Sequence, residues 1–329
     1  MIETFTLTKR YGDTVAVDRL TITVRPGQVT GFLGPNGAGK STTIRLIVGL
    51  DRPTAGKALV NGAPYASHPD PLHQVGVLLD AKAVHPARTA RAHLRALAAT
   101  QRLSARRADE VLELTGLTKV ANRRVGGFSL GMAQRLGIAA ALLADPLTLI
   151  LDEPVNGLDP EGVLWVRNLL RQEANRGKTV FLSSHLMSEM ALVADHLVII
   201  GRGRLLLEQP TVQFIAASSE QAARVRSPQA ALISRAVAGP DVRVRSLEPG
   251  LLEVHGVGAE TIGDLATTNG WTLHELTPLQ ASLEDAYMKL TENQADYAGR
   301  SLADAAGVPP RAESRTEERR ARNDRGQRA

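Results

Sequence analysis

Short runs of β-branched and other apolar residues alternate with helical patterns from residue 1 to about residue 210. Because short apolar runs bounded by polar and turn-forming residues are typical of buried strands, each run predicts one strand. Strands that alternate with helices are typical of an α/β domain with a largely parallel central sheet. The predicted strands cover residues 3–7, 20–24, 29–33, 58–60, 75–79, 147–151, 180–183 and 197–200.

The clearest helical pattern is LDPEGVLWVRNLLRQEA, residues 158–174. Asp159 is a natural N-cap, Pro160 suits the first helical position, and apolar residues recur on one face through Leu170. A second helical stretch, rich in Ala, Leu and Arg, lies between Arg88 and Leu114 and interrupts the alternation of strands. We expect it to belong to a helical lobe that covers about residues 88–145.

The pattern changes after about residue 218. Six segments then predict the order β-α-β-β-α-β, and a further helix, SLEDAYMKLTE, follows them. This order is that of a small ferredoxin-like α+β domain. We therefore divide the chain into a domain of residues 1–215, a small domain of residues 216–291 and a tail of residues 292–329. The six segments are AARVRS, PQAALISRAVA, DVRVRSLE, LLEVHGV, AETIGDLATTNG and WTLHEL.

Length and composition agree with two domains and exclude several classes of protein. The 329 residues can bury a sizeable core, at about 150 residues per domain. No run approaches the roughly 20 apolar residues of a membrane-spanning helix, and the start MIETFTLTKRYG lacks the segments of a secretory signal. We therefore expect a soluble, intracellular chain. The absence of cysteine excludes disulfides and thiolate metal sites.

The net charge of +5 does not by itself indicate a nucleic-acid partner, because much of it lies at the C-terminus. From Arg300 onward there are eight arginines and five acids, which is a surplus of three. That segment has almost no large apolar side chains, so it cannot bury enough surface to offset its ordering entropy. We expect a disordered, solvated tail; the alternative is a basic patch that docks on anionic lipid or on a partner.

The stretch GPNGAGKSTT, residues 34–43, follows the strand predicted at 29–33 and opens a helix. Its glycines let backbone amides converge on a phosphate, while Lys40 supplies a positive charge and Ser41 a hydroxyl for Mg²⁺. The N-terminus of the following helix also favours an anion. The alternative is an ordinary glycine-rich turn. The predicted nucleotide-binding residues of this loop are Gly34, Pro35, Asn36, Gly37, Ala38, Gly39, Lys40, Ser41 and Thr42.

Acidic residues follow the apolar run of LTLILDEP, residues 147–154. Asp152 can hold Mg²⁺ directly or through water, and Glu153 can act on the attacking water as a catalytic base. The alternative for Glu153 is a second structural carboxylate. Further on, VFLSSH ends a predicted strand with His185, which is placed either to touch a γ-phosphate or only to cap the strand end.

In their order, these elements resemble the ATP-binding cassette (ABC) ATPases over residues 2–215. The elements that match are Tyr11, GPNGAGKST, FSLGMAQR, LTLILDEP, NGLD and SSH. FSLGMAQR, residues 128–135, is similar to the signature motif of drug and antibiotic self-resistance exporters of the bacitracin and daunorubicin type. The resemblance implies a P-loop nucleotide-binding domain of the ABC type with a helical subdomain, followed by the small α+β domain.

The resemblance also implies roles for residues outside the phosphate loop. Tyr11 would stack on adenine, although it could instead be an aromatic residue at a strand edge. Ser129 and the Gly131 amide, at the start of a helix, would reach the γ-phosphate of ATP on a second copy of the chain, so that two copies share each site head to tail. Asp159 would link the two sites across the interface; capping of its helix is an equally good local explanation, and the two roles are compatible.

Two positions depart from the usual pattern of the family. Leu130 and Met132 stand where the signature usually has a glycine and a glutamine, but Ser129 and Gly131 keep the expected phosphate contacts. Asp80 stands where a glutamine normally follows the strand at 75–79. A carboxylate there could ligate Mg²⁺ but adds negative charge near the acidic pair, so metal binding and simple loop solvation both stay open for Asp80.

The resemblance implies a cytoplasmic ATPase subunit of an exporter, bound peripherally at the inner face of the membrane. Two copies would close around two ATP·Mg²⁺ and drive a separate integral membrane permease, with drug or antibiotic efflux as the expected transport and with no nucleic-acid partner. The alternative is a non-transport ABC ATPase that acts on ribosomes or DNA. Such proteins usually carry two cassettes or a long coiled coil, whereas only about 90 residues separate Lys40 from Ser129.

Overall fold

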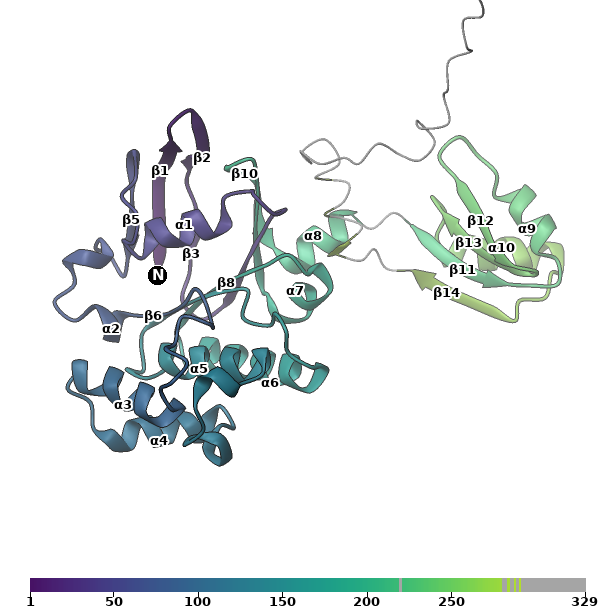
Figure 1. The fold of residues 1–329 in the computed structure, drawn as a ribbon. Helices are drawn as coiled ribbons and strands as arrows, with labels where there is room; N and C mark the ends of the chain where they lie inside the picture. Colours follow the sequence, from purple (N-terminus) through teal and green to yellow (C-terminus); the bar gives the residue numbers. More distant parts are fainter. Residues whose placement is uncertain (219–220, 280–282, 285–286, 288–289, 291–329) are drawn as a thin grey trace, which may run out of the picture. The chain divides into compact units, whose positions relative to one another are not determined.

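A computed structural model describes residues 1–218 and 221–279, together with residues 283, 284, 287 and 290 (Figure 1). The tail expected at residues 292–329 and most of the expected closing helix lie outside the described residues. The division of the chain at residues 215 and 291 stays a prediction.

A six-stranded sheet forms the centre of the first part, with the order β10-β9-β4-β8-β7-β6. Five of its strands are parallel, and β10 pairs antiparallel with β9 at one edge. The predicted, largely parallel sheet is therefore confirmed. Its strands are β4 Val29–Leu33, β6 Val75–Leu78, β7 Thr148–Asp152, β8 Thr179–Ser184, β9 His196–Gly201 and β10 Arg204–Pro210.

The second sheet is antiparallel, and its strand β1 pairs with each of the other three strands. The single strand predicted at residues 20–24 is wrong, because Leu20 ends one strand and the next begins at Thr23. Between these strands the Ile22 amide donates to a side chain, the Thr4 hydroxyl, at 3.0 Å. The strands are β1 Ile2–Tyr11, β2 Thr14–Leu20, β3 Thr23–Val24 and β5 Ala55–Val60.

Two cores cover the two faces of the central sheet. One joins the antiparallel sheet and α1, Lys40–Ile47, to buried side chains that include Phe32 and Phe181, whose ring centroids are 5.1 Å apart. The other joins five helices, together with Phe214 of the short α8, to the opposite face, and Leu283 and Tyr287 belong to it. Those helices are α3 Ala90–Thr100, α4 Ala105–Leu114, α5 Leu130–Ala141, α6 Pro160–Asn175 and α7 Met187–Val193.

The helical insertion predicted between residues 88 and 114 is confirmed as the pair α3 and α4, which lie beside α5 and α6 at the bottom of Figure 1. The helix predicted at residues 158–174 is α6, and Asp159 caps it. The remaining helical segments of this part are short. They are η1 Tyr65–Ser67, α2 Pro71–Gln74, η2 Thr118–Val120, η3 Val125–Gly127 and α8 Thr211–Ser218.

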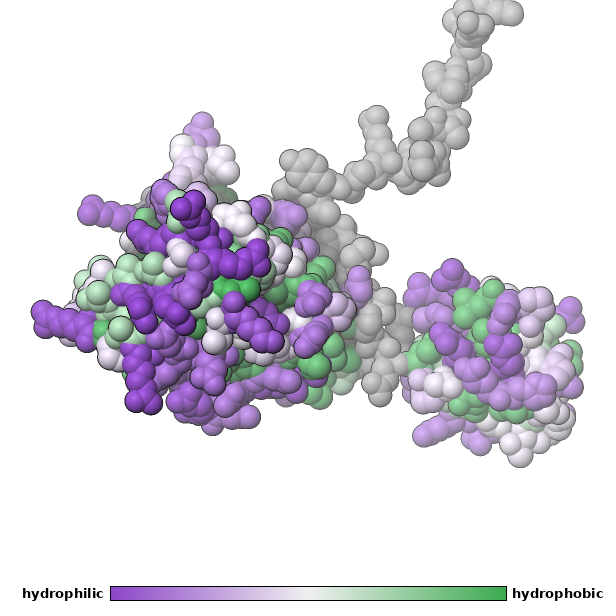
Figure 2. Space-filling model, turned by 60° about the horizontal axis from the view of Figure 1, so that its bottom comes forward, coloured by the Kyte–Doolittle hydropathy of each residue, from purple (hydrophilic) through white to green (hydrophobic). Residues whose placement is uncertain are grey.

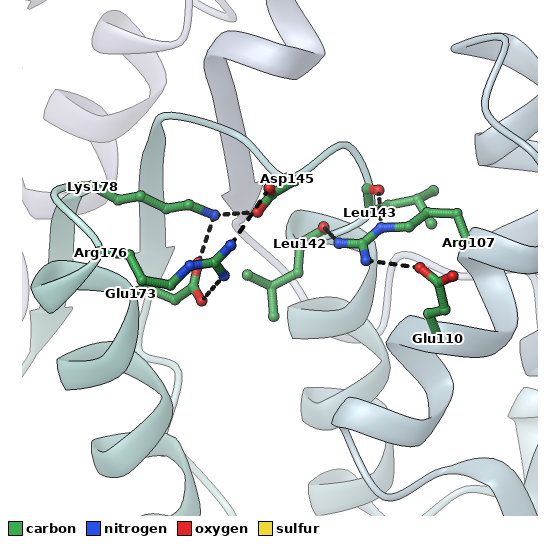
Figure 3. Close-up of polar contacts among 8 residues, drawn as sticks. All are labelled: Arg107, Glu110, Leu142, Leu143, Asp145, Glu173, Arg176 and Lys178. Atoms are coloured by element: carbon green, nitrogen blue, oxygen red, sulfur yellow. Dashed lines mark hydrogen bonds and ion pairs between the residues drawn. The ribbon is translucent and has the colours of Figure 1, made fainter.

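A cluster of ion pairs and hydrogen bonds connects α4, α5 and α6 to the beginnings of β7 and β8 (Figure 3). The ammonium of Lys178 contacts the carboxylates of Asp145 and Glu173, the latter at 2.6 Å. Arg176 also pairs with Glu173, at 3.0 Å. From α4, Arg107 donates to the Leu142 and Leu143 carbonyls at the end of α5, at 3.0 and 2.9 Å. This cluster lies at the end of the strands opposite to Asp152 and Ser184.

The part from residue 221 onward has the predicted element order β-α-β-β-α-β and a sheet in the order β12-β13-β11-β14, with all neighbours antiparallel. This topology is ferredoxin-like. Its own core includes Val225, Ile233, Val254 and Ile262. The elements are β11 Ala222–Arg226, α9 Ala230–Ala236, β12 Arg243–Glu248, β13 Leu251–His255, α10 Ala259–Asn269 and β14 Glu275–Leu279.

The last strand of this part is displaced from the prediction at WTLHEL, residues 271–276. Gly270 has a φ of +67° and ends α10 in the left-handed conformation. The Trp271 amide then bonds to the Ala266 carbonyl of the helix, at 2.9 Å. Trp271 therefore completes the helix end, the Thr272 amide donates to the Gln229 side chain at 3.2 Å, and residue pairing with β11 starts at Glu275.

The surface seen in Figure 2 is mostly hydrophilic, and its apolar side chains lie in small groups. None of the helices in the described ranges combines the length and the apolar character that crossing a membrane requires.

Candidate functional site

The glycine-rich loop connects β4 to α1 and adopts backbone conformations that require glycine. Gly37 and Gly39 have φ values of +83° and +102°, in a region that side chains strongly disfavour. A Cβ atom on Gly39 would lie 2.4 Å from the Ala16 carbonyl oxygen. The loop can therefore adopt this conformation because Gly37 and Gly39 have no side chains.

Lys40 begins α1 and is only 7% exposed. Its ammonium donates to the Gly34 and Pro35 carbonyls, at 2.7 and 3.3 Å, within the loop itself. Burial lowers the pKa of Lys40, and the nearby carboxylates of Glu153 and Asp152 partly oppose this shift. A buried positive charge at the N-terminus of a helix favours an anion at this place.

A cavity of about 300 Å³ lies against this loop and brings six of its nine predicted residues together with Glu153, whereas Gly34, Pro35 and Ala38 do not line it. Ala16 of β2 also lines it, and nothing in the local sequence around Ala16 marks it as a site residue. The cavity lining consists of Ala16, Asn36, Gly37, Gly39, Lys40, Ser41, Thr42 and Glu153.

The two acidic residues lie at the end of β7, where Ser183 of the neighbouring strand β8 connects them. The Ser183 hydroxyl donates to the Asp152 carboxylate and accepts a hydrogen bond from the Glu153 amide, at 3.0 Å. Glu153 has a φ of +50°, which is unusual for a residue other than glycine. Such conformations persist where the surrounding structure holds them and are frequent at functional sites.

His185 lies directly against the second acid. Its Nδ1 atom is 2.8 Å from Oε2 of Glu153, and both side chains are partly exposed. His185 was expected at a phosphate or as a strand cap; the structure pairs it with the predicted base.

Gln134 contacts Glu153 from the helical side. Its Nε2 atom donates to the Glu153 carbonyl at 2.7 Å, and Gln134 is only 5% exposed. Gln134 lies within FSLGMAQR and Ser183 within SSH, but no role of its own was predicted for either residue. A polar side chain within an otherwise buried strand or helix face was the available signal for both.

Two of the predicted site residues cap helices. The Ser129 hydroxyl accepts a hydrogen bond from the Met132 amide at 3.2 Å, at the start of α5. Asp159 accepts one from the Gly162 amide at 2.9 Å, at the start of α6. Ser129 thus begins a helix whose first amides are available to an anion.

Asp80 lies in a separate hollow of about 310 Å³ that Asp152, Glu153 and Gln134 also line. Its carboxylate accepts a hydrogen bond from the Lys82 amide at 2.8 Å. Among the described residues, no three Asp, Glu, His or Cys side chains are grouped so that they could hold a metal ion. Metal binding by Asp80 stays a prediction.

Tyr11 is 48% exposed, and its hydroxyl donates to Asp51 at 2.9 Å. Partial burial and this hydrogen bond raise the pKa of Tyr11. The Lys9 ammonium is 4.8 Å from the centroid of the ring. Arg45, in the last turn of α1, donates to the same Asp51 carboxylate at 2.8 Å. Tyr11 therefore lies beside the far end of α1 and does not line the phosphate cavity.

The parallel sheet, the glycine loop with its buried lysine and the acids at the end of β7 define a P-loop ATPase of the ATP-binding cassette class. A family model described as "ABC transporter" matches residues 17–156, and one described as "Domain of unknown function (DUF8746)" matches residues 221–284.

Comparison with curated proteins identifies the family. The chain is 45% identical over 213 residues to the bacitracin transport ATP-binding protein BcrA of Bacillus licheniformis, which covers 64% of this chain and 70% of the relative. It is 31% identical over 303 residues to BcrA of Enterococcus faecalis, which covers 88% of this chain and 96% of the relative. The chain therefore belongs to the ATP-binding subunits of ABC transporters and is an ATPase.

Solved structures agree with this assignment. The structure of an ATP binding subunit of an ABC transporter has a TM-score of 0.61 and 28% identity, covering 66% of this chain and 92% of that one. A dimeric ATP-binding cassette, MJ0796, bound to ADP and Pi, has a TM-score of 0.59 at 23% identity, covering 64% of this chain and 99% of that one. At that identity the second likeness shows the fold alone.

Proposed function

We propose that this protein is the ATP-hydrolysing subunit of an exporter, in which two copies close head to tail around two ATP·Mg²⁺ and drive a separate membrane permease. One observation carries the proposal: the Glu153 side chain lines the phosphate cavity and is hydrogen-bonded to His185. A carboxylate at this position can accept the proton of the water that attacks the terminal phosphate. His185 then orients that carboxylate and contacts the γ-phosphate.

The phosphate cavity supplies the loop and Ser41, and Asp152 lies next to Glu153 at the end of β7. The amides of the loop and Lys40 bind the phosphates, and the helix N-terminus adds a favourable dipole. Ser41 and Asp152 would hold Mg²⁺, since a hydroxyl and a carboxylate are oxygen ligands that suit this ion. The Ser183 hydroxyl fixes the orientation of Asp152. When bound, Mg²⁺ neutralises charge that develops on the phosphates.

A shared site explains the position of Ser129 and Gly131. Ser129 caps α5 at its first turn, so the amides of that turn and its hydroxyl can bind the γ-phosphate held by the loop of a second copy. Asp159 caps α6 in the same region and lies next to the partner's site in such a dimer. Tyr11 binds the adenine ring, and its hydroxyl anchor on Asp51 keeps the ring in place.

A permease contact is supported by a largely apolar groove of about 360 Å³. The groove joins the end of α1, β6, the Asp80 loop and the helices α3 and α5, so it crosses the boundary between the part that carries the phosphate loop and the helical lobe. A helix of the permease that binds there would move when the helical lobe moves relative to the part that carries the phosphate loop. The groove is lined by Val48, Leu50, Tyr65, Val77, Leu78, Leu79, Asp80, Ala81, Ala83, Val84, His93, Gly137 and Ala140.

The class of transported molecule follows from the relatives. Several are named for bacitracin transport or Nod factor export, and the match to the first of them spans 70% of that relative. We therefore propose export of a drug or antibiotic, with the subunit bound at the inner face of the membrane.

The variant Glu153→Gln tests the catalytic assignment. The amide keeps the shape of the side chain but cannot accept the proton, so ATP binding should persist while turnover falls by about 10²- to 10⁴-fold. Steady-state hydrolysis and binding of a fluorescent ATP analogue measure the two quantities. Glu113→Gln, at an exposed site on α4, is the matched control. Wild-type turnover in Glu153→Gln would refute the proposal.

The variant Ser129→Arg tests the shared site. In the Glu153→Gln background, which should accumulate an ATP-bound dimer, the bulky arginine side chain should prevent dimer formation and leave ATP binding to the monomer intact. Size-exclusion chromatography with ATP·Mg²⁺ measures it. Ser104→Arg is the control, because Ser104 is an exposed serine at the start of α4. A dimer that survives Ser129→Arg contradicts the head-to-tail arrangement.

Affinity purification from membranes tests the partner. An integral membrane protein should co-purify, and His93→Glu, which puts a charge in the apolar groove, should abolish its recovery. Recovery of ribosomes or DNA in place of a membrane protein would favour the non-transport alternative.

A further inference from the structure

Glu153 has a strained backbone that three hydrogen bonds hold from different elements. Its φ is +50°. Its amide donates to Ser183 of β8 at 3.0 Å, and its carbonyl accepts from the Gln134 side chain at 2.7 Å and from the Asn156 amide at 3.2 Å. Non-glycine residues keep such a conformation only where their surroundings determine it. The direction of the Glu153 side chain therefore depends on these contacts.

Of these three contacts, the one from Gln134 comes from outside the sheet and its following loop. Gln134 belongs to α5, and at 5% exposure it has little freedom to move. Its amide nitrogen faces the carbonyl at a short distance, and only that end of the side chain can donate. When Gln134 is replaced, the Glu153 carbonyl keeps its hydrogen bond from the Asn156 amide. The main expected change is therefore a shift in the position of the peptide group of Glu153.

A packing contact between Leu130 and Gly157 also holds α5 against the loop that follows β7. Leu130, in the first turn of α5, packs so closely on Gly157 that a Cβ atom there would lie 2.1 Å from its Cδ2 atom. Gly157 also has a φ of +75°. Leu130 thus fixes the start of α5 against residue 157, and Gln134 fixes the next turn against residue 153. The leucine that departs from the usual signature fills this contact.

We propose that Gln134 is a positioning residue for hydrolysis: its carboxamide holds the Glu153 peptide so that the carboxylate faces the phosphate cavity. The inference rests on the proposed function of Glu153 as the base. Gln134 itself does not touch the reacting atoms. Its effect should therefore appear in the rate of the chemical step and should depend on the presence of a carboxylate at position 153.

The first experiment uses Gln134→Met in the full-length protein, since methionine matches the length of glutamine and cannot donate the hydrogen bond. We expect kcat to fall about 10- to 100-fold, in line with the cost of misplacing a catalytic group by about 1 Å. The affinity for the fluorescent ATP analogue should change less than about 3-fold, as expected for an effect on kcat alone. Gln172→Met, at an exposed site on α6, is the matched control and should match wild type.

The second experiment places Gln134→Met in the Glu153→Gln background. If Gln134 acts through the carboxylate of Glu153, the second substitution should reduce the residual rate less than about 2-fold, because residues that act as one unit are not additive. A general loss of structure would multiply the two effects. Multiplied effects, or a wild-type kcat in Gln134→Met, would overturn the proposal.

A third measurement applies if Gln134→Met lowers the thermal unfolding temperature. Gln134→Glu has the same shape and can donate only when its carboxyl is protonated. The groups that share its hollow are Asp80, Lys82, Asp152 and Glu153. Relative to wild type, its kcat should rise at least about 5-fold as pH falls from 8.5 to 6, since burial and neighbouring carboxylates raise the pKa of such a group. A pH-independent ratio would overturn the proposal.

These outcomes separate the two levels of inference. Full turnover in Glu153→Gln removes the proposed function itself. Loss of turnover in Glu153→Gln together with full turnover in Gln134→Met removes only the role of Gln134.

Discussion

His185 Nδ1 lies 2.8 Å from Glu153 Oε2, although the two residues are 32 positions apart. The register of the sheet explains the contact. Strands β7 and β8 are parallel neighbours, and Asp152 pairs with Ser183 at their last shared position. The residues that follow each strand therefore emerge at the same edge of the sheet, where the phosphate loop also lies.

Replacing His185 with Ala should lower kcat by at least about 10-fold, because the Glu153 carboxylate loses the group that orients it. Binding of ATP should be nearly unchanged. Steady-state hydrolysis at several ATP concentrations separates the two effects. The control is His255→Ala, since His255 makes a contact of the same 2.8 Å length with Glu253, on the small sheet. Equal losses in both variants would contradict a specific role for His185.

Gly157→Ala should destabilise the protein because of two effects at one position. The new methyl group would collide with Leu130, and the φ of +75° disfavours any side chain. Thermal unfolding should show a lower midpoint than wild type. Adding Leu130→Gly should restore part of the lost stability, with a coupling of about 1 kcal/mol between the effects of the two substitutions on the free energy of unfolding. If the two effects simply add, this result contradicts the packing argument.

Lys178→Met should cost roughly 3 kcal/mol of the free energy of unfolding, because it leaves the buried Glu173 carboxylate with Arg176 alone. Urea unfolding measures the change. Adding Glu173→Leu should reduce this cost, since a buried charge is worse without its partner than when both are removed. Lys119→Met, at an exposed lysine, is the control. If the double variant is the less stable one, the pair is not the source of the effect.

Stability should also depend on pH through Asp145. The hydrogen bond and charge of Lys178, with Arg176 nearby, lower the pKa of Asp145 below its ordinary value of 3.8. A lowered carboxyl pKa adds stability that is fully present above the unfolded value and is lost as pH falls through the folded value. The side chain is 53% exposed, so the contribution should be at most about 1 kcal/mol.

The measurement for this prediction compares wild type with Asp145→Asn in urea at a series of pH values. The difference in the free energy of unfolding should be constant above about pH 5 and should shrink below about pH 4. A difference that grows as the solution is acidified would contradict the sign of the pKa shift.

Much of this site could be predicted from sequence because its strongest signals are local. The phosphate loop needs glycine at Gly37 and Gly39 for its own backbone, and the acids directly follow an apolar strand. The N-cap role of Asp159 likewise depends on its immediate neighbours. Each of these residues is identified by positions within a few residues of itself.

The contributions of Ser183 and Gln134 could not be predicted in this way. Both act on Glu153 from other elements, so their roles depend on the strand register and on how α5 packs. The strand β10 was also missed, since its pairing with β9 lets it expose more of its residues than a central strand does. For Asp80 the sequence left two roles open, and its hydrogen bond to the Lys82 amide agrees with a loop role without testing the other.

The ion cluster around Lys178 stands where β7 and β8 begin, while Asp152 and Ser183 stand where those strands finish. About five residues of extended chain, roughly 17 Å, separate the two ends. Changes that far apart combine almost independently. Substitutions near Lys178 can therefore change the thermal stability of the protein during evolution while selection preserves the catalytic residues at the other end of the strands. For the same reason, thermal stability can be engineered at the Lys178 end without altering ATP hydrolysis.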